Sequence, residues 1–561
     1  MNKKWECPEI DETKVNNLIY KYKMDKILAK ILANRGISDD REMELFLKPT
    51  RADFHDPFLM PDMEIAVNRI LKAIHQDEKI IIYGDYDADG ITSVTVLKKF
   101  LEERGIVVGT YIPNRISEGY GLNIGAVKNI YEQGYNLIIT VDCGITGTEE
   151  IDYANSLGME VIVTDHHEPA DKLPKALAIV DTKRKDNKYP FTQLAGVGVV
   201  FKLIQAFSIK VGIEQKEYLK YLDIVCIGTI SDIVPLVDEN RVIAKLGLLL
   251  VAQTRNPGLK ALLKITGFNN INSTTISFGI APRINACGRM GNEKLALELF
   301  LSNNYEAAEK LAIKLNEYNK KRQAIEKQIY DEAVEIIEQE NQDNSCIVLG
   351  NDDWSHGIIG IVASKITEKY YKPSILVCYE GNMGKGSGRS IQGFDLHEAL
   401  MECGDSLEKF GGHEMAVGIT IKRENFSKFR DSLERYAKKK QIDKLVPVIK
   451  IDCELMLKEI NIDSIKSLQL LEPFGEANQE PLFFIKNLKI NSIRALSEGK
   501  HLKVGLREDK YIIDAIGFNM GEFSEKFMID DKVDIIGSLS INSFNGVENM
   551  QIILKDIRKS Y

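Results

Sequence analysis

The sequence predicts an α/β protein of several domains, with a doubly wound parallel sheet near its start and a small β-barrel at its end. Between residues 80 and 180, short β-branched runs alternate with helical segments, which is typical of a parallel sheet covered by helices. A single helical pattern then runs from residue 306 to about 342, and a second α/β unit follows it. From residue 446 onward, short alternating strands replace these patterns.

Length and composition predict an ordinary soluble globular protein of several domains. At 561 residues the chain is too long for one core, because domains average roughly 150 residues. Its 44% hydrophobic and 28% charged residues are ordinary for a globular protein, and no apolar run is long enough to span a membrane. The N-terminus lacks a signal-peptide core, and the 8 cysteines include no CxxC pair. We therefore expect a cytoplasmic location and neither a disulfide framework nor a zinc knuckle.

The net charge of −9 leaves the class of partner open. It argues weakly against a general nucleic-acid coat protein. It does not exclude a nucleic-acid enzyme, because a channel can be locally positive and bound metal ions neutralise phosphates.

Local patterns predict the order of elements. The first 50 residues have helical apolar spacing and are interpreted as a helical cap on the next domain, and a further helix is expected at 65–74. Strands are expected at 80–83, 107–112, 137–141, 161–164 and 178–180, with helices such as 121–133 and 149–157 between them. In parallel sheets of this kind, ligands bind beyond the carboxyl ends of the strands.

Acidic and imidazole side chains follow several of these strands. They are Asp85, Asp87 and Asp89 after 80–83, Asp142 after 137–141, Asp165, His166 and His167 after 161–164, and Asp232 after an apolar run at 224–230 that we interpret as another strand end. A DxDxD loop alone is equally well explained as a solvated acidic turn or a helix cap. Four such segments at one predicted edge instead favour a metal cluster, and carboxylates with neutral imidazoles suit manganese, or magnesium with less nitrogen ligation. The chain has no Walker loop, GxSxG elbow or GxGxxG after a strand to suggest another chemistry.

The motifs GDYDADGITS, TVDCGI, TDHHEP and GTISDIVPL, in this order, resemble the DHH phosphoesterase superfamily. Five later segments narrow the resemblance to the RecJ family of single-strand-specific 5′→3′ exonucleases: APRINACGRMGN, WSHGIIGIVASKI, GKGSGRS, FGGHEMAVGIT and LEPFGEANQEP. The tripeptide DHH alone is a weak signal. Nine motifs in order, spanning about residues 46–559, make a specific match.

This resemblance implies two divalent metal ions, with manganese preferred or magnesium, and a division of their ligands. Asp87, with Asp85 nearby, would serve the first ion and Asp142 would bridge. The second ion would be held by Asp89, His166 and Asp232, and all of these ligands except Asp85 are expected to be catalytic. Asp165 and His167 would orient the ligands. Tyr83 stands where some related phosphodiesterases have a histidine, which leaves the role of Asp85 open.

Six side chains are expected to contact substrate: Arg115, Arg289, Arg322, Ser387, Arg389 and His413. By resemblance, Arg115 and Arg289 line the route of the nucleic acid, Ser387 and Arg389 hold its 5′-terminal phosphate, and His413 contacts the scissile region. On the residues alone, alternatives remain. Arg289 could form an ion pair on a tight turn, Arg322 could be solvated, and GKGSGRS, which we expect to be a phosphate-binding loop, could be a hairpin turn.

The predicted domains are an N-terminal helical cap at 1–50, a DHH catalytic domain at 51–304, a connector helix at 305–345, a DHH-associated domain at 346–440 and an OB-fold domain at 446–561. The last has strand patterns at 481–485, 502–506, 511–518, 533–539 and 550–554, and a hairpin signal at Asn545-Gly546. OB folds often bind single strands. The 15 basic and 18 acidic residues of 446–561 give no electrostatic support for this, so a barrel that only braces the two lobes is the alternative.

Three functions compete. The leading hypothesis is a metal-dependent exonuclease that removes nucleotides from the 5′ end of single-stranded DNA by a two-metal mechanism, in DNA repair and recombination. A DHH phosphodiesterase acting on cyclic dinucleotides or short oligonucleotides is the alternative, disfavoured by the extra barrel. A non-catalytic scaffold is disfavoured because all expected ligands are present. A helicase and a single-strand-binding protein are partners implied by the family role alone, and we expect a monomer.

Overall fold

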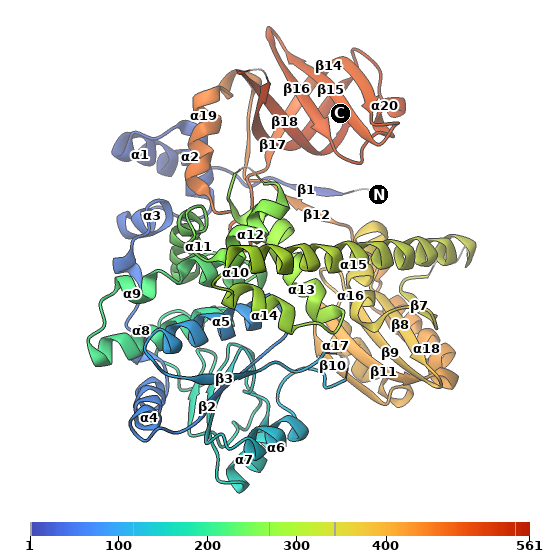
Figure 1. The fold of residues 1–561 in the computed structure, drawn as a ribbon. Coiled ribbons are helices and arrows are strands. Elements are labelled where there is room, and N and C mark those ends of the chain that lie inside the picture. Colours follow the sequence, from blue (N-terminus) through green and yellow to red (C-terminus); the bar gives the residue numbers. More distant parts are fainter. Residues whose placement is uncertain (1–2, 116, 269, 341–343, 545, 561) are drawn as a thin grey trace.

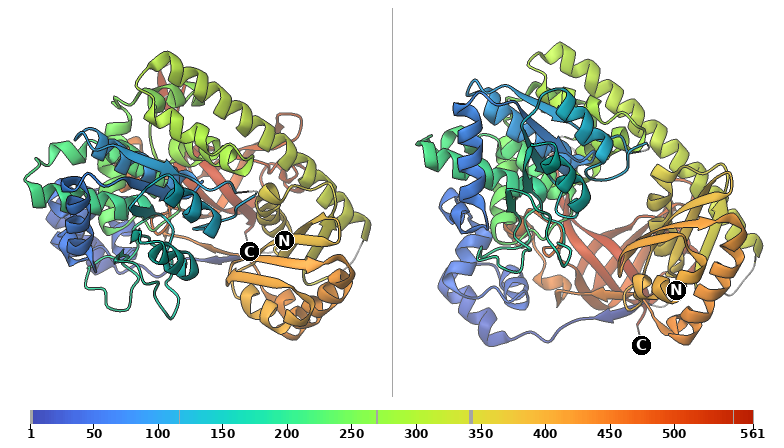
Figure 2. Two further views of the ribbon diagram at one scale, coloured as in Figure 1. Left: turned by 60° about the horizontal axis from the view of Figure 1, so that its bottom comes forward. Right: turned by 90° about the horizontal axis from the view of Figure 1, so that it is seen from below.

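The computed structural model describes residues 3–115, 117–268, 270–340, 344–544 and 546–560. Gln342 and Asn545, on which two of the expectations fall, lie outside the described residues. Two α/β lobes are joined by one long helix, and a β-barrel lies at the top of the view in Figure 1. Figure 2 shows the long helix running from one lobe to the other. Among the described helices, none is long and apolar enough to cross a lipid bilayer.

The first lobe contains the predicted parallel sheet. Its strands are β2 (Ile80–Gly84), β3 (Val108–Tyr111), β4 (Leu137–Val141), β5 (Glu160–Thr164) and β6 (Ala178–Val180), in the spatial order β3-β2-β4-β5-β6. One face packs on α4 (Met63–His75), α5 (Ala88–Glu102) and α8 (Gly196–Val211), and the other on α6 (Ile124–Glu132) and α7 (Thr148–Ser156). Alternate residues such as Ile80 and Ile81 belong to the cores on opposite faces. The doubly wound sheet is therefore confirmed.

The apolar run before Asp232 is not a strand, and this prediction was wrong. It forms α10 (Leu222–Ser231), and Asp232 is the residue that caps its carboxyl end. Every residue from Leu222 to Ile230 is buried, so the run has no polar face to reveal a helical period. A short, wholly apolar segment of this kind has the same pattern as a buried strand.

The rest of the first lobe is helical and leads into the connector. Its elements are α9 (Lys216–Leu219), α11 (Asp238–Val251), α12 (Pro257–Thr266), a π-helical turn η3 (Thr275–Ile280), α13 (Ala281–Arg289) and α14 (Lys294–Leu301). The long helix α15 (Tyr305–Glu340) begins against α12, α13 and α14 and later contacts α16 (His356–Tyr370) of the second lobe. Its buried residues include Leu315 in the core of the first lobe and Ile329 in a core of the second lobe.

The second lobe is a mixed sheet in the order β10-β11-β9-β8-β7. The strands are β7 (Ile347–Asn351), β8 (Ser374–Glu380), β9 (Met383–Arg389), β10 (Lys409–His413) and β11 (Ala416–Lys422). Helices α15 and α16 pack on one face, and α17 (Leu396–Glu402) and α18 (Phe426–Lys439) pack on the other.

The segment GKGSGRS lies within β9 apart from its last residue, so the expected loop was wrong. Its glycines alternate along the strand and face the core. A Cβ on Gly386 would lie 2.6 Å from Cγ1 of Ile419, and a Cβ on Gly384 would lie 2.7 Å from Cγ1 of Val377. The glycines therefore allow close packing of neighbouring strands, whereas local sequence suggested a turn.

The C-terminal part is a closed barrel. Strands β14 (Phe483–Leu496), β15 (His501–Glu508), β16 (Tyr511–Gly517), β18 (Val547–Lys559) and β17 (Lys532–Phe544) pair in this order, and β14 also pairs with β17. Two short strands, β12 (Val448–Lys450) and β13 (Cys453–Glu454), and helices α19 (Ile462–Ser467) and α20 (Phe523–Lys526) flank it. The predicted OB-type barrel is confirmed.

The first residues of the chain pack with this barrel. β1 (Lys4–Glu6) pairs in parallel with β12, and α1 (Glu12–Tyr22), α2 (Lys26–Asn34) and α3 (Asp40–Leu47) share one apolar core with the barrel strands. The expected packing of this segment as a cap on the following domain was therefore incomplete. Of these elements, α3 also contacts that domain, through α11. Sequence patterns report helical faces but not the distant segment that covers them.

Candidate metal centre and nucleic-acid interface

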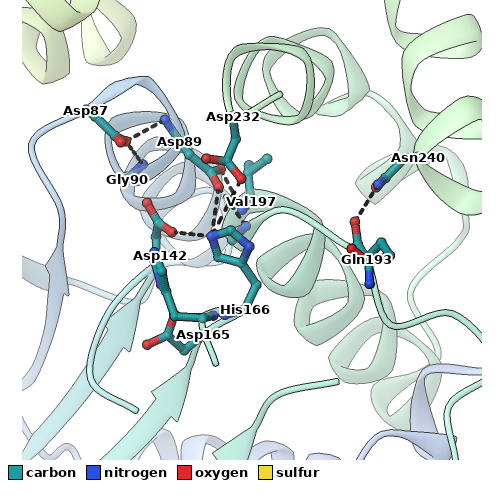
Figure 3. A network of polar contacts seen from close by, with 12 residues as sticks. Asp87, Asp89, Gly90, Asp142, Asp165, His166, Gln193, Val197, Asp232 and Asn240 are labelled. Carbon is teal, nitrogen blue, oxygen red and sulfur yellow. Dashed lines mark hydrogen bonds and ion pairs between the residues drawn. The ribbon is translucent and has the colours of Figure 1, made fainter. Parts of the chain in front are cut away.

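The loop after β2 ends in the N-terminus of α5. Asp87 is the N-cap, and its Oδ1 accepts hydrogen bonds from the backbone amides of Asp89 at 2.9 Å and Gly90 at 3.1 Å. Gly90 must lack a side chain because its Cβ would lie 2.4 Å from the carbonyl oxygen of Asp85. The tight turn buries Asp85 and leaves the carboxylate of Asp87 facing the centre drawn in Figure 3.

Asp89 is fixed from the opposite side by the start of α8. Its two carboxylate oxygens accept hydrogen bonds from the backbone amides of Gly196 at 2.7 Å and Val197 at 2.8 Å. Burial raises the pKa of Asp89 well above its usual range, and the nearby carboxylates of Asp232 and Asp87 raise it further. A helix N-terminus thus orients a carboxylate that lies among other acids.

Asp142 occupies the end of β4 in a left-handed backbone conformation, with φ of 59°. Its side chain lies so close to α8 that a Cβ on Gly196 would be 2.6 Å from Oδ1 of Asp142. Burial raises the pKa of Asp142, and the surrounding carboxylates, Asp89 first among them, add to the effect. Backbone strain in this region is common at functional sites, where the surroundings hold one geometry.

His166 points its Nε2 atom at three carboxylates (Figure 3). Nε2 lies 3.1 Å from Oδ1 of Asp142, 3.6 Å from Oδ2 of Asp232 and 3.8 Å from Oδ2 of Asp89. The ring also hydrogen-bonds the backbone carbonyl of Leu194. Burial lowers the pKa of His166 to about 3, with His167 contributing, so the ring is neutral at ordinary pH. Because the carbonyl takes the ring N–H, Nε2 has a free lone pair towards the carboxylates.

Asp165 fixes the backbone next to the ligands and the ring of His167 by hydrogen bonds. Its Oδ1 lies 2.7 Å from Nδ1 of His167, and its carboxylate accepts hydrogen bonds from the backbone amides of Ile145 and His166. Burial acts to raise the pKa of Asp165, but hydrogen bonding and the charge of His167 outweigh it, and the pKa is lowered. The same contact raises the pKa of His167 against the effect of burial.

The ligand atoms fall into three overlapping groups, each within 4.8 Å: Asp85, Asp87 and Asp142; Asp89, His166 and Asp232; and Asp142, His166 and His167. Asp142 and His166 each belong to two of them, and Asp142, with two carboxylate oxygens, is the one that could bridge two ions. His167 lies close enough to be a direct ligand, whereas the sequence interpretation gave it only an orienting role.

Divalent metal ions fit this donor set. Within the described residues, Oδ1 of Asp85, Oδ1 of Asp142 and Nε2 of His166 are buried and have no hydrogen-bond partner. Burial raises the pKa of Asp85 strongly, and burial followed by the charge of Asp87 raises that of Asp232 to about 7. Several buried carboxylates without a counter-charge are costly, and oxygen donors with one or two imidazoles suit Mn²⁺ and Mg²⁺.

Three expected arginines gather beside this centre. Arg289 lies near enough to Arg115, Arg322 and Asp87 for their charges to act on it, and burial lowers its pKa to about 10. Its Nη1 donates to the carbonyl oxygen of Gly357 at 2.9 Å, which links the two lobes. Arg115 lies over the ring of Tyr86, with Cζ 5.0 Å from the ring centroid. Such a cluster, in which like charges crowd together, is suited to binding phosphates.

Arg322 is neither solvated nor free. Its guanidinium is mostly buried and forms an ion pair with Glu326 and hydrogen bonds with Asn319 on the same helix. Glu326 is also paired with Lys365 of α16. Arg322 therefore lies near Arg289 within a fixed network of its own.

Ser387 and Arg389 lie side by side on β9. Nη1 of Arg389 donates to Oγ of Ser387 at 3.1 Å, and a Cβ on Gly360 would lie 2.9 Å from the same Oγ. Gly360 follows Gly357 by one turn of α16, so this pair lies close to the contact of Arg289 with the second lobe. His413 is exposed at the end of the edge strand β10.

Two polar residues near the centre were missed from the sequence. Asp181 follows β6 and is fully buried, with Oδ2 lacking a hydrogen-bond partner among described residues, and burial raises its pKa to about 7. The strand-end rule that located Asp142 also applies to it. The hydroxyl of Tyr120 donates to the backbone carbonyl of Asp142 at 3.3 Å and lies 3.1 Å from Nδ1 of His167. No pattern around Tyr120 distinguishes it from a loop tyrosine.

The fold and this centre define a DHH protein. Residues 79–229 match the DHH family N-terminal domain, 343–439 the DHHA1 domain and 451–556 the RecJ OB domain. The chain is similar to the single-stranded-DNA-specific exonuclease RecJ of Bacillus subtilis, with 41% identity covering 99% of this chain and 70% of that protein. RecJ of Haemophilus influenzae is 33% identical, covering 94% and 95%.

A solved structure agrees with these matches. The crystal structure of RecJ from Thermus thermophilus in complex with Mn²⁺ superposes with a TM-score of 0.86 and 29% identity, covering all of this chain and 80% of that one. The Mg²⁺ complex of the same protein gives a TM-score of 0.81. The chain belongs to the RecJ family, and the resemblance inferred from its motifs is confirmed.

Proposed function

We propose that this protein is a metal-dependent exonuclease that hydrolyses single-stranded DNA from its 5′ end. The observation that carries the proposal is the set of three overlapping groups of carboxylate and imidazole ligand atoms, which Asp142 and His166 link, at the carboxyl edge of the sheet. RecJ relatives that this chain matches over 70% and 95% of their length are named single-stranded-DNA-specific exonucleases, and two solved RecJ structures hold Mn²⁺ or Mg²⁺.

We assign Asp85, Asp87 and Asp142 to one metal ion, and Asp142, Asp89, His166 and Asp232 to the other. Bound divalent ions supply a water nucleophile and neutralise charge on the phosphate. Neighbouring groups of the protein fix the orientation of the ligand side chains. Backbone amides of α8 hold Asp89, the Leu194 carbonyl fixes which nitrogen of His166 is the acceptor, and Asp165 fixes the ring of His167.

The substrate route is assigned to the basic side chains of both lobes. Arg115 and Arg289 lie on the first lobe beside Asp87, and they attract backbone phosphates towards the centre. Ser387 and Arg389, which are already in contact, offer a hydroxyl and a guanidinium to a 5′-terminal phosphate. His413 is assigned to contact with the nucleic acid near the scissile bond. Arg322, fixed by Glu326 and Asn319, is assigned to adding positive charge beside Arg289 along this route. A pocket for the terminal phosphate would set the polarity of digestion.

Polarity and strand preference test the proposal directly. Single-stranded oligonucleotides labelled at either end, and duplexes with a 5′ overhang, a 3′ overhang or blunt ends, are incubated with Mn²⁺ or with EDTA. We expect release of short products from the 5′ label first, digestion of the 5′ overhang, and none in EDTA. Equal rates on both overhangs or on blunt duplex would refute the directional assignment.

The alternative of a phosphodiesterase for cyclic dinucleotides or short oligonucleotides is not favoured, because the chain carries the RecJ OB domain as well as the two lobes. Competition between a long single strand and a dinucleotide separates the two. We place the activity in DNA repair and recombination in the cytoplasm, with the chain acting as a monomer alongside a helicase and a single-strand-binding protein. Co-purification and light scattering would test these assignments.

A further inference from the structure

The sheet of the second lobe has one open half-face. In this sheet Ser387 of β9, Gly418 of β11 and Gly411 of β10 lie directly opposite one another, so they share a face. Helix α16 covers this face over β8 and β9, whereas β10 is exposed along its whole length. Figure 1 places β10 at the edge of this sheet that faces the first lobe.

The glycines show that the surface is bare there. A Cβ added to Gly411 or Gly418 would meet no atom within 4 Å. This is unlike Gly386 on the opposite face, which is packed against Ile419. A ligand can therefore approach the backbone of β10 and β11 closely, beside Ser387.

A row of basic side chains borders this bare surface. Lys385, Thr420 and Lys409 are in register across β9, β11 and β10, one step of the pleat from the Ser387 row and on the same face. Both lysines are exposed, and among the described residues neither takes part in an ion pair. Lys422, further along the same face, is paired with Glu408. Strands are spaced about 4.8 Å apart, so the two amino groups can converge above Thr420.

The row of Lys385, Thr420 and Lys409 lies next to the phosphate pocket proposed at Ser387 and Arg389. It lies towards the edge of the sheet that faces the first lobe. Because the guanidinium of Arg389 lies against Oγ of Ser387, that pocket is centred on Ser387, roughly 6.7 Å along β9 from Lys385. At the N-terminus of α16, burial lowers the pKa of His356, and the charges of Lys385 and Arg115 lower it further. One cation from each lobe therefore lies near this imidazole. Glu380 is the acidic neighbour on this side.

We infer that Lys385, Thr420 and Lys409 form a second anion subsite, which binds a phosphate group of the nucleic acid adjacent to the one at Ser387 and Arg389, beside the bare backbone of Gly411 and Gly418. The inference rests on the proposed function. The phosphate comes either from an internal linkage of the strand or from a 5′-triphosphate end, and both offer the same chemistry to two ammonium groups and a hydroxyl.

The test measures binding of 5′-phosphorylated hexanucleotides to Lys385→Gln and Lys409→Gln, each in an Asp142→Asn background that prevents turnover. Each variant is expected to bind roughly fivefold more weakly at 0.1 M salt, and the slope of log K against log salt should fall by about 0.7, the value for one single-strand phosphate contact. Lys438→Gln is the matched control, because Lys438 is an exposed lysine on α18, across the sheet. It should leave both quantities unchanged.

The phosphate is located with a series of hexanucleotides that each carry one neutral methylphosphonate linkage, together with one 5′-triphosphorylated strand. We expect the losses from Lys385→Gln and Lys409→Gln to disappear on one and the same neutralised linkage, or the wild-type gain from the triphosphate to vanish in both variants. Unchanged affinity for both the monophosphorylated and the triphosphorylated strands, or an equal loss on every strand, would overturn the subsite. If the wild-type protein neither binds nor cleaves the unmodified strand, the proposed function itself is refuted instead.

Discussion

The backbone amide of Leu236 donates a hydrogen bond to the carbonyl oxygen of Glu476 at 2.9 Å. Leu236 belongs to the loop that follows the metal-site residue Asp232, and Glu476 belongs to the segment that leads into the barrel. Arg241 strengthens the same joint, because its Nη2 donates to the carbonyls of Leu471 and Glu472. The motif LEPFGEANQEP contributes no metal ligand. It instead contacts the loop that follows Asp232 and so supports the position of that ligand.

The first prediction concerns this joint. In Gly475→Ala, the new Cβ would lie 2.6 Å from Cδ1 of the buried Leu236, so this side chain or its segment must shift. We expect a loss of roughly 1–3 kcal/mol in the free energy of unfolding, measured by chemical denaturation. Gly404→Ala is the control, because its Cβ would meet only an ordinary contact at 3.7 Å with Phe410. Equal free energies of unfolding for the two variants would show that the contact between Gly475 and Leu236 is not tightly packed.

The second prediction separates stability from activity at Asp142. Asp142→Asn removes a buried negative charge from among Asp89, Asp85 and Asp87, which crowd it when no metal is bound. We expect exonuclease activity to be lost, while the metal-free protein becomes more stable by about 1–3 kcal/mol. Thermal denaturation in EDTA measures the stability. Substantial activity with Mn²⁺, or a lower Tm than wild type in EDTA, contradicts the prediction.

The third prediction is a pH dependence of metal-free stability. Burial and neighbouring charge raise the folded-state pKa of Asp89 and Asp142, and raise that of Asp232 to about 7. A raised pKa means that the folded state binds more protons than the unfolded chain, so stability is lost as pH rises through the folded pKa. We expect the Tm in EDTA to fall from pH 6.5 to 8.5. The increase in Tm on adding Mn²⁺ should be larger at pH 8.5, because the metal replaces these protons.

His166 does not contribute to the change in stability between pH 6.5 and 8.5. The lowered pKa of His166, about 3, affects stability only below the ordinary histidine pKa of roughly 6.5, so it does not contribute here. Asp232→Asn should weaken the dependence, because it removes one of the two described site carboxyls, with Asp181, whose pKa is raised to about 7. A metal-induced increase in Tm that is the same at both pH values would refute the linkage.

The fourth prediction distinguishes the two kinds of glycine in the second lobe. Gly386→Ala places a Cβ 2.6 Å from Cγ1 of Ile419 in the core, whereas Gly411→Ala places one in open space. We expect the first to lower the free energy of unfolding by roughly 1–3 kcal/mol and the second to leave it nearly unchanged. Denaturation of the two purified variants makes the comparison. If Gly386→Ala is as stable as Gly411→Ala, the close packing described for β9 is wrong.

The sheet and most of the metal-site residues could be predicted because both depend on local signals. Five β-branched runs gave the strands, and the rule that ligands follow strand ends placed Asp142 and His166 at one edge. The same rule found Asp232 for the wrong reason, since α10 is a helix whose buried sides hide its period. Asp181 satisfied the rule and was overlooked.

Other features could not be predicted because they depend on residues far away in the sequence. The glycines of β9 look like a loop until Ile419 is known to face Gly386. The contact of Tyr120 with the carbonyl of Asp142 depends on the path of the loop after β3. The bond between Arg289 and the carbonyl of Gly357 joins two lobes whose relative placement no local pattern encodes.

The shared core of α1, α2 and the barrel has a consequence for synthesis. Helices α1 and α2 leave the ribosome before the barrel strands, which share an apolar core with Leu28 and Ile31 and are made more than 400 residues later. At about 5–20 residues per second, their apolar faces wait roughly 20–90 s for a partner. During that interval the nascent chain exposes a ready hydrophobic surface, so we expect ribosome-associated chaperones to bind the N-terminal helices and release them only when the last strands emerge.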